Sequence, residues 1–281
     1  MPLTGSCLCG DVRFEIQGEL EPLCHCHCSM CRKSHGAAFA SFVGTGKSGF
    51  RWLRGADATK RYASSPGAFR PFCGRCGSIV PAAPESMDRV FVPAGLLAED
   101  PRLAPLPHFF VASKAPWYTI PDSQPQFDEY PSGMGEGVPS PRKTEPTPEA
   151  VRGGCLCGAV AWETPRPVAG PIFLCHCNRC RRARAAAHGA NLFVELERFR
   201  WLRGAERVER YKVPEAERFA QAFCRDCGSK VPSLGRRAVI PAGSLDDDPG
   251  VRPAMHVYVA SKAPWFEICD DLPRYPEQAP S

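Results

Sequence analysis

The sequence predicts a mainly β protein made of two tandem copies of one small domain. The segment FRWLRGA occurs at residues 50–56 and again at 199–205, and the cysteines repeat in the same order at an offset of 148 to 151 residues. Thirty prolines in 281 residues, about twice the average share, interrupt the chain too often for long helices. The length fits two domains of ordinary size.

Short antiparallel strands are expected to dominate each copy. Val12, Phe14 and Ile16 alternate with charged residues, and Val160 and Trp162 alternate at the matching place, which is the period of a half-buried strand. Further strands are expected at 38–43, 51–53, 79–80, 90–92 and 109–111, with counterparts in the second copy. The one helical candidate follows the central cysteine cluster of each copy, and residues 181–187 are the better case.

The repeat also divides the chain. We expect a first domain at residues 3–130, a linker at 131–150 and a second domain at 151–275. The linker contains five prolines, three glycines and several charged residues without apolar periodicity, which is typical of a connection between domains.

Fourteen of the sixteen cysteines form two equivalent sets. The first set is Cys7, Cys9, Cys26, Cys28, Cys31, Cys73 and Cys76, and the second is Cys155, Cys157, Cys175, Cys177, Cys180, Cys224 and Cys227. The chain shows no run of about 18 apolar residues and no signal-peptide pattern, so a cytoplasmic location without membrane contact is expected. Thiols persist in that reducing compartment, and closely spaced cysteines there indicate metal ligands rather than disulfides.

The outer cysteine pairs of each copy predict a closed, structural zinc site. Zinc-binding loops usually supply ligands in pairs, and four thiolates around one ion make a tetrahedral site. The first site would use Cys7, Cys9, Cys73 and Cys76, and the second would use Cys155, Cys157, Cys224 and Cys227. A glycine follows each pair, at positions 10, 77, 158 and 228, and can take the positive φ that turns backbone N–H groups toward sulfur.

The central cysteines predict a second kind of site, an open zinc. The three ligands would be Cys26, Cys28 and Cys31 in the first copy, and Cys175, Cys177 and Cys180 in the second. Three thiolates leave one position of a tetrahedral ion free, and a free position distinguishes catalytic from structural zinc. A thiol or a water could bind there as a nucleophile of lowered pKa.

Two alternatives to an open zinc remain. A fourth protein ligand could close the site, either Cys24 or His25 in the first copy, although the second copy has Phe and Leu at those places. His27 and His176 are further candidates, but each lies between two ligands and is expected to point away. The other alternative is a disulfide.

Other repeated residues allow a structural and a functional interpretation. His108 and His256 precede VASKAPW, and we favour buried, hydrogen-bonded histidines at a strand start over general bases. Trp117 and Trp265 favour core packing over stacking on a substrate.

A run of cations follows each central cluster. The run consists of Arg32 and Lys33 in the first copy, and of Arg181, Arg182 and Arg184 in the second. These side chains could offset the charge of the thiolates and receive the carboxylates of an anionic thiol. A solvated charged face is the alternative.

Charge argues against a nucleic-acid partner. The formal net charge of +5 counts thiols as neutral, and fourteen thiolates with four zinc ions would bring it to −1. The 35 basic residues are spread along the chain and are nearly balanced by 30 acidic ones. A zinc-stapled binding module for protein or nucleic acid is nevertheless the alternative to an enzyme. Redox chemistry ranks last, because only Cys24 and Cys269 lie outside the two sets.

At these residues the chain resembles the glutathione-dependent formaldehyde-activating enzyme family, also called the CENP-V/GFA domain. The motifs in both copies are G-x-C-L-C-G, C-H-C-x-x-C-R, F-C-x-x-C-G, P-A-G and S-K-A-P-W. The resemblance covers nearly all of each copy, roughly residues 3–130 and 152–275.

The resemblance implies a β-tent-like fold, a structural zinc on the outer cysteines and a catalytic zinc on the central three, hence up to four zinc ions per chain. It also implies addition of glutathione to formaldehyde, formally a carbon–sulfur lyase run in reverse, with a glutathione-like thiol and an aldehyde as substrates. The chain departs from the family pattern in its duplication, in Cys24 and in pocket residues such as Phe39 against His188.

Overall fold

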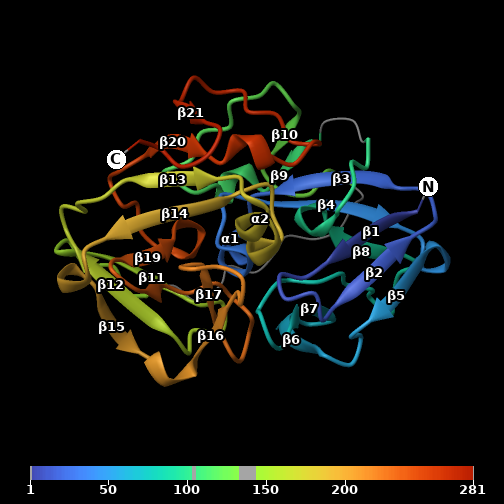
Figure 1. The fold of residues 1–281 in the computed structure, drawn as a ribbon, viewed down its shortest axis with the longest axis horizontal. Coiled ribbons are helices and arrows are strands. Elements are labelled where there is room, and N and C mark those ends of the chain that lie inside the picture. Colours follow the sequence, from blue (N-terminus) through green and yellow to red (C-terminus); the bar gives the residue numbers. More distant parts are fainter. Residues whose placement is uncertain (1, 103–105, 133–143, 281) are drawn as a thin grey trace.

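Each copy of the repeat folds into a lobe of short strands, and the two lobes lie side by side (Figure 1). The computed structural model describes residues 2–102, 106–132 and 144–280. The mainly β fold with tandem lobes confirms the predicted fold class. None of the helices in the described residues combines the length and the apolar character needed to cross a membrane.

The elements of the first lobe are β1 (Leu3–Ser6), β2 (Arg13–Ile16), β3 (Glu21–Cys26), α1 (Ser29–His35), β4 (Ala40–Thr45), β5 (Phe50–Arg54), β6 (Thr59–Ser65), β7 (Ala68–Cys73), β8 (Val90–Pro93), β9 (His108–Phe109) and β10 (Gln126–Phe127). Those of the second lobe are β11 (Ala150–Gly154), β12 (Ala161–Pro165), β13 (Ile172–Cys175), α2 (Asn178–Arg184), β14 (Gly189–Val194), β15 (Arg200–Arg203), β16 (Val208–Lys212), β17 (Ala220–Cys224), β18 (Ser233–Leu234), β19 (Ala238–Pro241), β20 (Pro253–Val257) and β21 (Arg274–Tyr275). Short 3₁₀ turns are η1 (Lys47–Gly49), η2 (Ala94–Leu96), η3 (Val111–Ser113), η4 (Leu196–Arg198), η5 (Ala205–Arg207), η6 (Ala242–Ser244) and η7 (Val259–Ser261).

The lobes share one sheet topology. The first has sheets of order β1-β2-β5 and β10-β9-β3-β4-β8 with the hairpin β6–β7, and the second has β11-β12-β15 and β18-β19-β14-β13-β20-β21 with the hairpin β16–β17. Most neighbours are antiparallel, as predicted. The strand that carries the central cysteines also pairs in parallel, β3 with β9 and β13 with β20, which brings distant residues beside that cluster.

Three predicted elements differ from the structure. The strand predicted at 109–111 is β9 (His108–Phe109), which ends because Phe110 takes the left-handed conformation and Val111 begins the turn η3. Ile79 forms only an isolated bridge with Phe72, because the return stretch makes few bonds before Pro81, which lacks an N–H, ends it. The second helix was predicted at 181–187 but spans Asn178–Arg184. It begins inside the cysteine cluster, since Cys177 caps it by accepting a hydrogen bond from the Cys180 N–H, and it ends at the left-handed Ala185.

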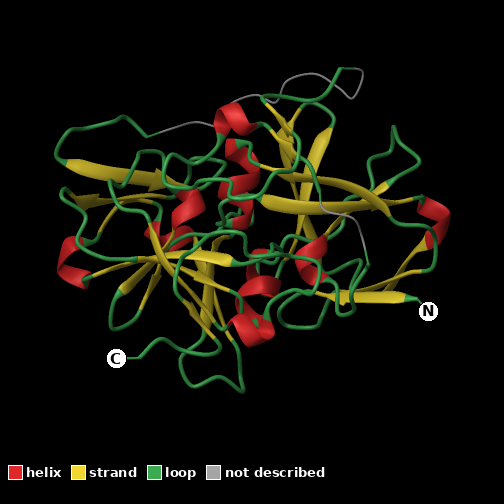
Figure 2. Cartoon of the chain, turned by 90° about the horizontal axis from the view of Figure 1, so that it is seen from above, coloured by secondary structure: helices red, strands yellow, loops and turns green. Residues whose placement is uncertain are grey.

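The α-helices lie at the contact between the lobes, and strands extend to both sides of them (Figures 1 and 2). On α1, Lys33 pairs with Asp246 of the other lobe at 2.8 Å, and both side chains are only 2% exposed. On α2, Arg181 donates to the Leu97 carbonyl of the first lobe at 2.8 Å. Arg32 and Arg184 are buried as well, and Arg182 is half-buried, so the solvated charged face considered for these cations is wrong.

The turns after the outer cysteines also meet at this contact. Phe72 and Phe223 lie with ring centroids 6.4 Å apart, one from each lobe. A Cβ added to Gly77 would come within 2.3 Å of Phe223, and one added to Gly228 would come within 2.4 Å of Phe72. Both glycines also have φ above +70°, so space and backbone conformation each require glycine here.

The predicted linker is described only at its ends. Residues 133–143 lie outside the described part of the chain. From residue 144 the chain contacts the second lobe, where the Thr144 N–H and hydroxyl donate to Asp246 at 3.1 Å.

Candidate metal centre

The structure brings the fourteen repeated cysteines together in four groups. Within each group the sulfur atoms all lie within 4.8 Å of one another. The groups are Cys7, Cys9, Cys73 and Cys76; Cys155, Cys157, Cys224 and Cys227; Cys26, Cys28 and Cys31; and Cys175, Cys177 and Cys180. These are the four sets that the sequence predicts, and each could hold a metal ion.

The outer groups have the geometry of a tetrahedral site. The Sγ atoms of Cys7 and Cys9 are 3.4 Å apart, and those of Cys9 and Cys73 are 3.7 Å apart. In the second lobe, Cys157 and Cys224 are separated by 3.8 Å. A zinc tetrahedron with Zn–S bonds of about 2.3 Å has sulfur atoms about 3.8 Å apart, so these groups fit zinc.

One backbone N–H donates to a sulfur of each outer group. The Val12 N–H donates to Cys7 Sγ at 3.3 Å, and the Val160 N–H donates to Cys155 Sγ at 3.2 Å. The glycines at positions 10, 77, 158 and 228 all have positive φ, as predicted. These N–H groups favour thiolate over thiol, which is the form that binds metal.

The central groups are formed by one strand end and the first turn of a helix. Cys26 ends β3, and Cys28 and Cys31 lie at the start of α1, where Cys28 Sγ accepts from the Cys31 N–H at 3.3 Å. Cys177 and Cys180 repeat this bond at 3.3 Å. The first group is buried, whereas Cys177 leaves the second group partly open to solvent.

One cysteine of each central group carries a strongly lowered pKa. Hydrogen bonds from Cys26 and Cys28, together with the positive charge of Arg70, hold the pKa of Cys31 well below its usual value. Hydrogen bonds from Cys175 and Cys180 lower the pKa of Cys177 to about 3. Hydrogen bonding within each group therefore favours the thiolate form of one cysteine.

The proposed fourth ligands do not join these groups. Among the described residues, no further cysteine, histidine or carboxylate belongs to either central group. His25 points to the opposite face of β3 from Cys26, and its Nδ1 lies 2.9 Å from Ser41 Oγ. Cys24 shares the face of Cys26 and packs nearby, and burial raises the pKa of its thiol.

The histidine between the ligands points away, into a relay of three residues. His27 Nε2 lies 2.9 Å from His108 Nδ1, and His108 Nε2 lies 3.0 Å from Asp122 Oδ1. The second lobe repeats the relay with His176, His256 and Asp270, at 2.8 and 2.9 Å. His108 and His256 are 1% and 2% exposed, in line with the predicted buried, hydrogen-bonded role.

The rings beside the two relays meet across the contact between the lobes. Phe39 and His188, predicted as pocket residues, pack against each other with centroids 5.6 Å apart. Phe266 packs on both of them, at 6.0 and 5.5 Å. Burial lowers the pKa of His188 to about 3, so this imidazole is neutral in the core.

An arginine lies beside each central group. Arg70 Nη1 donates to Cys31 Sγ at 3.5 Å. Burial lowers the pKa of Arg70, but the Cys31 and Cys28 thiolates outweigh it and raise this pKa overall. Arg184, which is 7% exposed, lies one helical turn after Cys180, and burial lowers its pKa to about 10 against the opposing effect of the cysteines.

Sequence reasoning identified Arg184 but not Arg70, Asp122 or Asp270. Asp122 and Asp270 each follow the relay histidine of their copy by 14 residues, so this repeated spacing could have revealed them. Arg70 left no such signal, because the second lobe has Gln221 at the same place in its hairpin.

Trp117 and Trp265 follow the packing interpretation. Trp117 is 1% exposed, and Trp265 packs partly buried against the core. Cys269 is exposed and joins none of the four groups.

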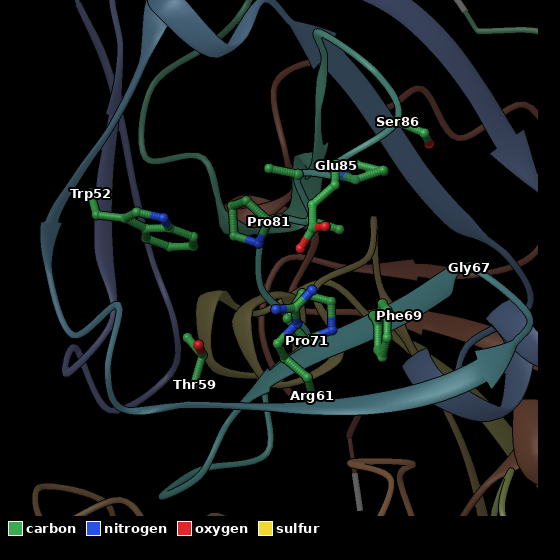
Figure 3. A pocket seen from close by; sticks show the side chains of 12 residues that line it. Trp52, Thr59, Arg61, Gly67, Phe69, Pro71, Pro81, Glu85 and Ser86 are labelled. Carbon is green, nitrogen blue, oxygen red and sulfur yellow. The ribbon is translucent and has the colours of Figure 1, made fainter.

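A cleft of about 700 Å³ lies on the other face of hairpin β6–β7 (Figure 3). Trp52 and Phe69 line opposite sides of it, with Pro71 between them. Side chains alternate along β7, so Phe69 and Pro71 face the cleft while Arg70 reaches Cys31 on the reverse side. The hairpin thus separates this cleft from the central cysteines.

Comparison with known proteins agrees with this geometry. The model of the glutathione-dependent formaldehyde-activating enzyme family matches twice, at residues 2–113 and 150–261. A Halomonas elongata protein, provisionally named a glutathione-dependent formaldehyde-activating enzyme, is 33% identical over 132 residues, which are 43% of this chain and 82% of that protein.

A crystal structure of a Rhodobacter sphaeroides protein is 29% identical and covers 37% of this chain and 98% of its own, with a TM-score of 0.30 that is too low to bear on the fold. The two family matches, each spanning the central and outer cysteine groups of one lobe, cover most of the chain. The chain therefore belongs to the glutathione-dependent formaldehyde-activating enzyme family and contains the domain of that family twice in tandem.

Proposed function

We propose that the chain is a zinc-dependent enzyme that joins a small thiol, such as glutathione, to formaldehyde or a related aldehyde, formally a carbon–sulfur lyase acting in reverse. The observation that carries the proposal is the three-sulfur group. In each lobe, three cysteines converge without a fourth protein donor among the described residues. Membership in the family and the name of the Halomonas relative support the choice of thiol and aldehyde.

The four groups take two different roles in this proposal. The outer groups, with four sulfurs at tetrahedral spacing, would hold structural zinc and fix the loops at the contact between the lobes. The central groups would hold zinc with one position free. When bound there, zinc supplies a Lewis acid that keeps the sulfur of a substrate thiol ionised at neutral pH.

The side chains around a central group would direct the addition. The substrate thiol loses its proton and its sulfur adds to the carbonyl carbon, so a C–S bond forms and the C=O electron pair moves to oxygen, which then takes up a proton. The relay of His27, His108 and Asp122 holds the ligand loop from behind. Because Cys26 is buried, the protein around it would exclude water from that side of the reacting atoms.

Metal content and thiol response test this function together. The purified chain is expected to contain four zinc ions, and a cobalt-substituted chain is expected to change its visible spectrum when glutathione is added. With formaldehyde present, S-hydroxymethylglutathione should form faster than in buffer. Four zinc ions without a response to glutathione or another thiol would contradict the enzyme and favour the zinc-stapled binding module.

Substitutions in single lobes assign the activity. Cys28→Ser removes a central ligand from the first lobe, and Cys177→Ser removes the equivalent ligand from the second. Each variant is expected to retain both outer zinc ions and to lose one central ion. The remaining turnover of each variant measures the lobe that is left intact.

A further inference from the structure

Each central group has one arginine, but the two lobes supply it from different elements. In the first lobe Arg70 comes from β7, and its Nη1 lies 3.5 Å from Cys31 Sγ. In the second lobe Arg184 comes from the last position of α2. Residues four apart on a helix share a face, so Arg184 lies on the same side of α2 as Cys180.

Neighbouring contacts place Arg184 at the second group. Gly189 pairs with Cys175 across β13 and β14, and a Cβ added to Gly189 would be 3.5 Å from the Cys180 Cβ and 3.6 Å from the Arg184 Cγ. Asn191 accepts a hydrogen bond from Arg184 Nη2 at 3.0 Å and so orients the guanidinium.

The positions that correspond to these arginines are occupied by other residues. Arg70 pairs with Tyr62 in its hairpin, and Gln221 pairs with Tyr211 in the other, where the Gln221 amide donates to the Ala222 carbonyl at 2.7 Å. His35 ends α1 where Arg184 ends α2, and its Nδ1 lies 2.8 Å from the Arg184 carbonyl. Each site thus has one guanidinium, but the two arginines occupy non-equivalent positions of the repeat.

Each of these arginines has one buried N–H group that lacks a hydrogen-bond partner among the described residues. These groups are Arg70 Nε and Arg184 Nη1. Buried donors are nearly always paired in folded proteins, so a leftover donor beside an incomplete metal site indicates a ligand.

A phenol follows the same pattern. Tyr258 packs against the cluster formed by Cys175, Cys180 and Val257 in the second lobe. Phe110 stands at the corresponding place in the first lobe, as the left-handed residue before the equivalent 3₁₀ turn, and Tyr130 packs on it with centroids 4.6 Å apart. In the second lobe a tyrosine therefore lies at position 258, and in the first lobe Tyr130 packs on Phe110, the counterpart of Tyr258.

We propose that Arg70 and Arg184 bind the oxygen atom that becomes negative when the substrate thiolate adds to the aldehyde, an inference that rests on the proposed function. The arginine lies beside a ligand sulfur, and the aldehyde oxygen is only two bonds from the attacking sulfur. The carboxylates of a glutathione-like thiol are many bonds further away. As the C–S bond forms, the oxygen receives the carbonyl electron pair, and a guanidinium N–H stabilises it until a proton arrives.

The test separates this oxygen from a substrate carboxylate. Arg70→Gln is made in a Cys177→Ser background, and Arg184→His in a Cys28→Ser background, so that each substitution copies the residue of the other lobe. In each background, kcat for adduct formation is expected to fall about 100-fold. The Kd of glutathione and of neutral 2-mercaptoethanol, read from the cobalt spectrum, should change less than about threefold.

Relocating the guanidinium provides a rescue. Gln221→Arg is added to Arg184→His, which moves the arginine of the second lobe from the helix to the strand position that Arg70 occupies in the first. We expect kcat to recover at least about tenfold. Arg179→Gln, an exposed cation on the same helix, is the matched control and should leave kcat unchanged.

Three results would overturn the assignment. An unchanged kcat excludes a role for the arginines, and weaker binding of glutathione alone, with normal binding of 2-mercaptoethanol, assigns them to a carboxylate. Loss of the central metal in the variants, measured by elemental analysis, assigns them to site structure. If the unsubstituted lobes show no thiol response at all, the proposed function itself fails, which is distinct from these three outcomes.

Discussion

His27 and His108 are hydrogen-bonded ring to ring at 2.9 Å, and the bond fixes the one residue that separates Cys26 from Cys28. Asp122 holds His108 in turn at 3.0 Å. Burial, followed by the charge of His108, lowers the pKa of His27 to about 2, so its ring is neutral and acts in positioning rather than as a charged group. The relay therefore sets the spacing of two of the proposed metal ligands without contacting the metal site itself.

Loss of this relay should weaken metal binding at the central group of the same lobe. His108→Gln is expected to lower zinc affinity there by about 10- to 100-fold, as is typical when a residue that orients metal ligands is removed. Competition with a chromophoric chelator measures the affinity of each site class. His256→Gln should affect only the second lobe, and equal affinities in both variants and the parent would contradict the positioning role.

The outer groups should control folding. Cys76→Ser is expected to remove one structural zinc and much of the roughly 10–16 kcal/mol of apparent folding free energy that such an ion can supply. Because the Gly77 turn packs on Phe223 of the other lobe, both lobes should lose stability. Circular-dichroism melts with and without a chelator check this. The exposed Cys269→Ser is the control, and a melting temperature as low as that of Cys76→Ser would show that any cysteine loss suffices.

The ion pair between Lys33 and Asp246 should be costly to break from one side. Both side chains are 2% exposed, so Lys33→Met leaves a buried carboxylate without its partner, which typically costs about 3–5 kcal/mol. The double variant with Asp246→Leu is expected to recover most of this loss. Urea unfolding measures both. A loss below about 1 kcal/mol in the single variant would show that the two hydrogen bonds from Thr144 are enough to hold the carboxylate.

Lys230 should make stability depend on pH. It is fully buried, and burial, with the charge of Arg184, lowers its pKa to about 7. An unfolded lysine has a pKa of about 10.4, so between these values the unfolded chain binds more protons and the free energy of unfolding rises with pH. Toward pH 7 this lysine is charged in the core and the stability is lowest.

Lys230→Ile, which copies Ile79 of the first lobe, should remove up to about 1.4 kcal/mol of slope per pH unit. Urea unfolding at pH 7, 8 and 9 compares the two proteins, and the cysteines that titrate in both cancel in the difference. Parallel pH profiles would mean that the Gly77 and Gly228 carbonyls, which accept hydrogen bonds from Lys230, keep it charged throughout.

The cysteine groups could be predicted because sets of cysteines that could hold a metal follow a characteristic spacing, and the duplication repeats that spacing in both copies. Strands such as β2 and β12 followed from alternation of side chains. The hairpins β6–β7 and β16–β17 did not, since their burial depends on the other lobe. Tyr62 of β6, for example, packs against the core that contains Cys224.

The arginines show the limit of reasoning from repeats. The sequence groups the cations after the central clusters together. In the structure Arg32 and Lys33 contact the other lobe, whereas Arg184 lies beside Cys180. Arg70 was invisible because its counterpart is Gln221, and only the folded hairpin brings it to Cys31. A residue that occupies non-equivalent positions in the two copies can be recognised only in the folded structure.

The ion pair between Lys33 of the first lobe and Asp246 of the second has no equivalent with the lobes exchanged. The corresponding places in the opposite direction are Arg182 and Ala98, and alanine offers no charge. In a symmetric dimer of two identical single-lobe chains, every contact would occur twice, once on each side of the interface. Because both lobes belong to one chain, equivalent positions can carry different residues. The two lobes can therefore diverge without having to associate from separate chains.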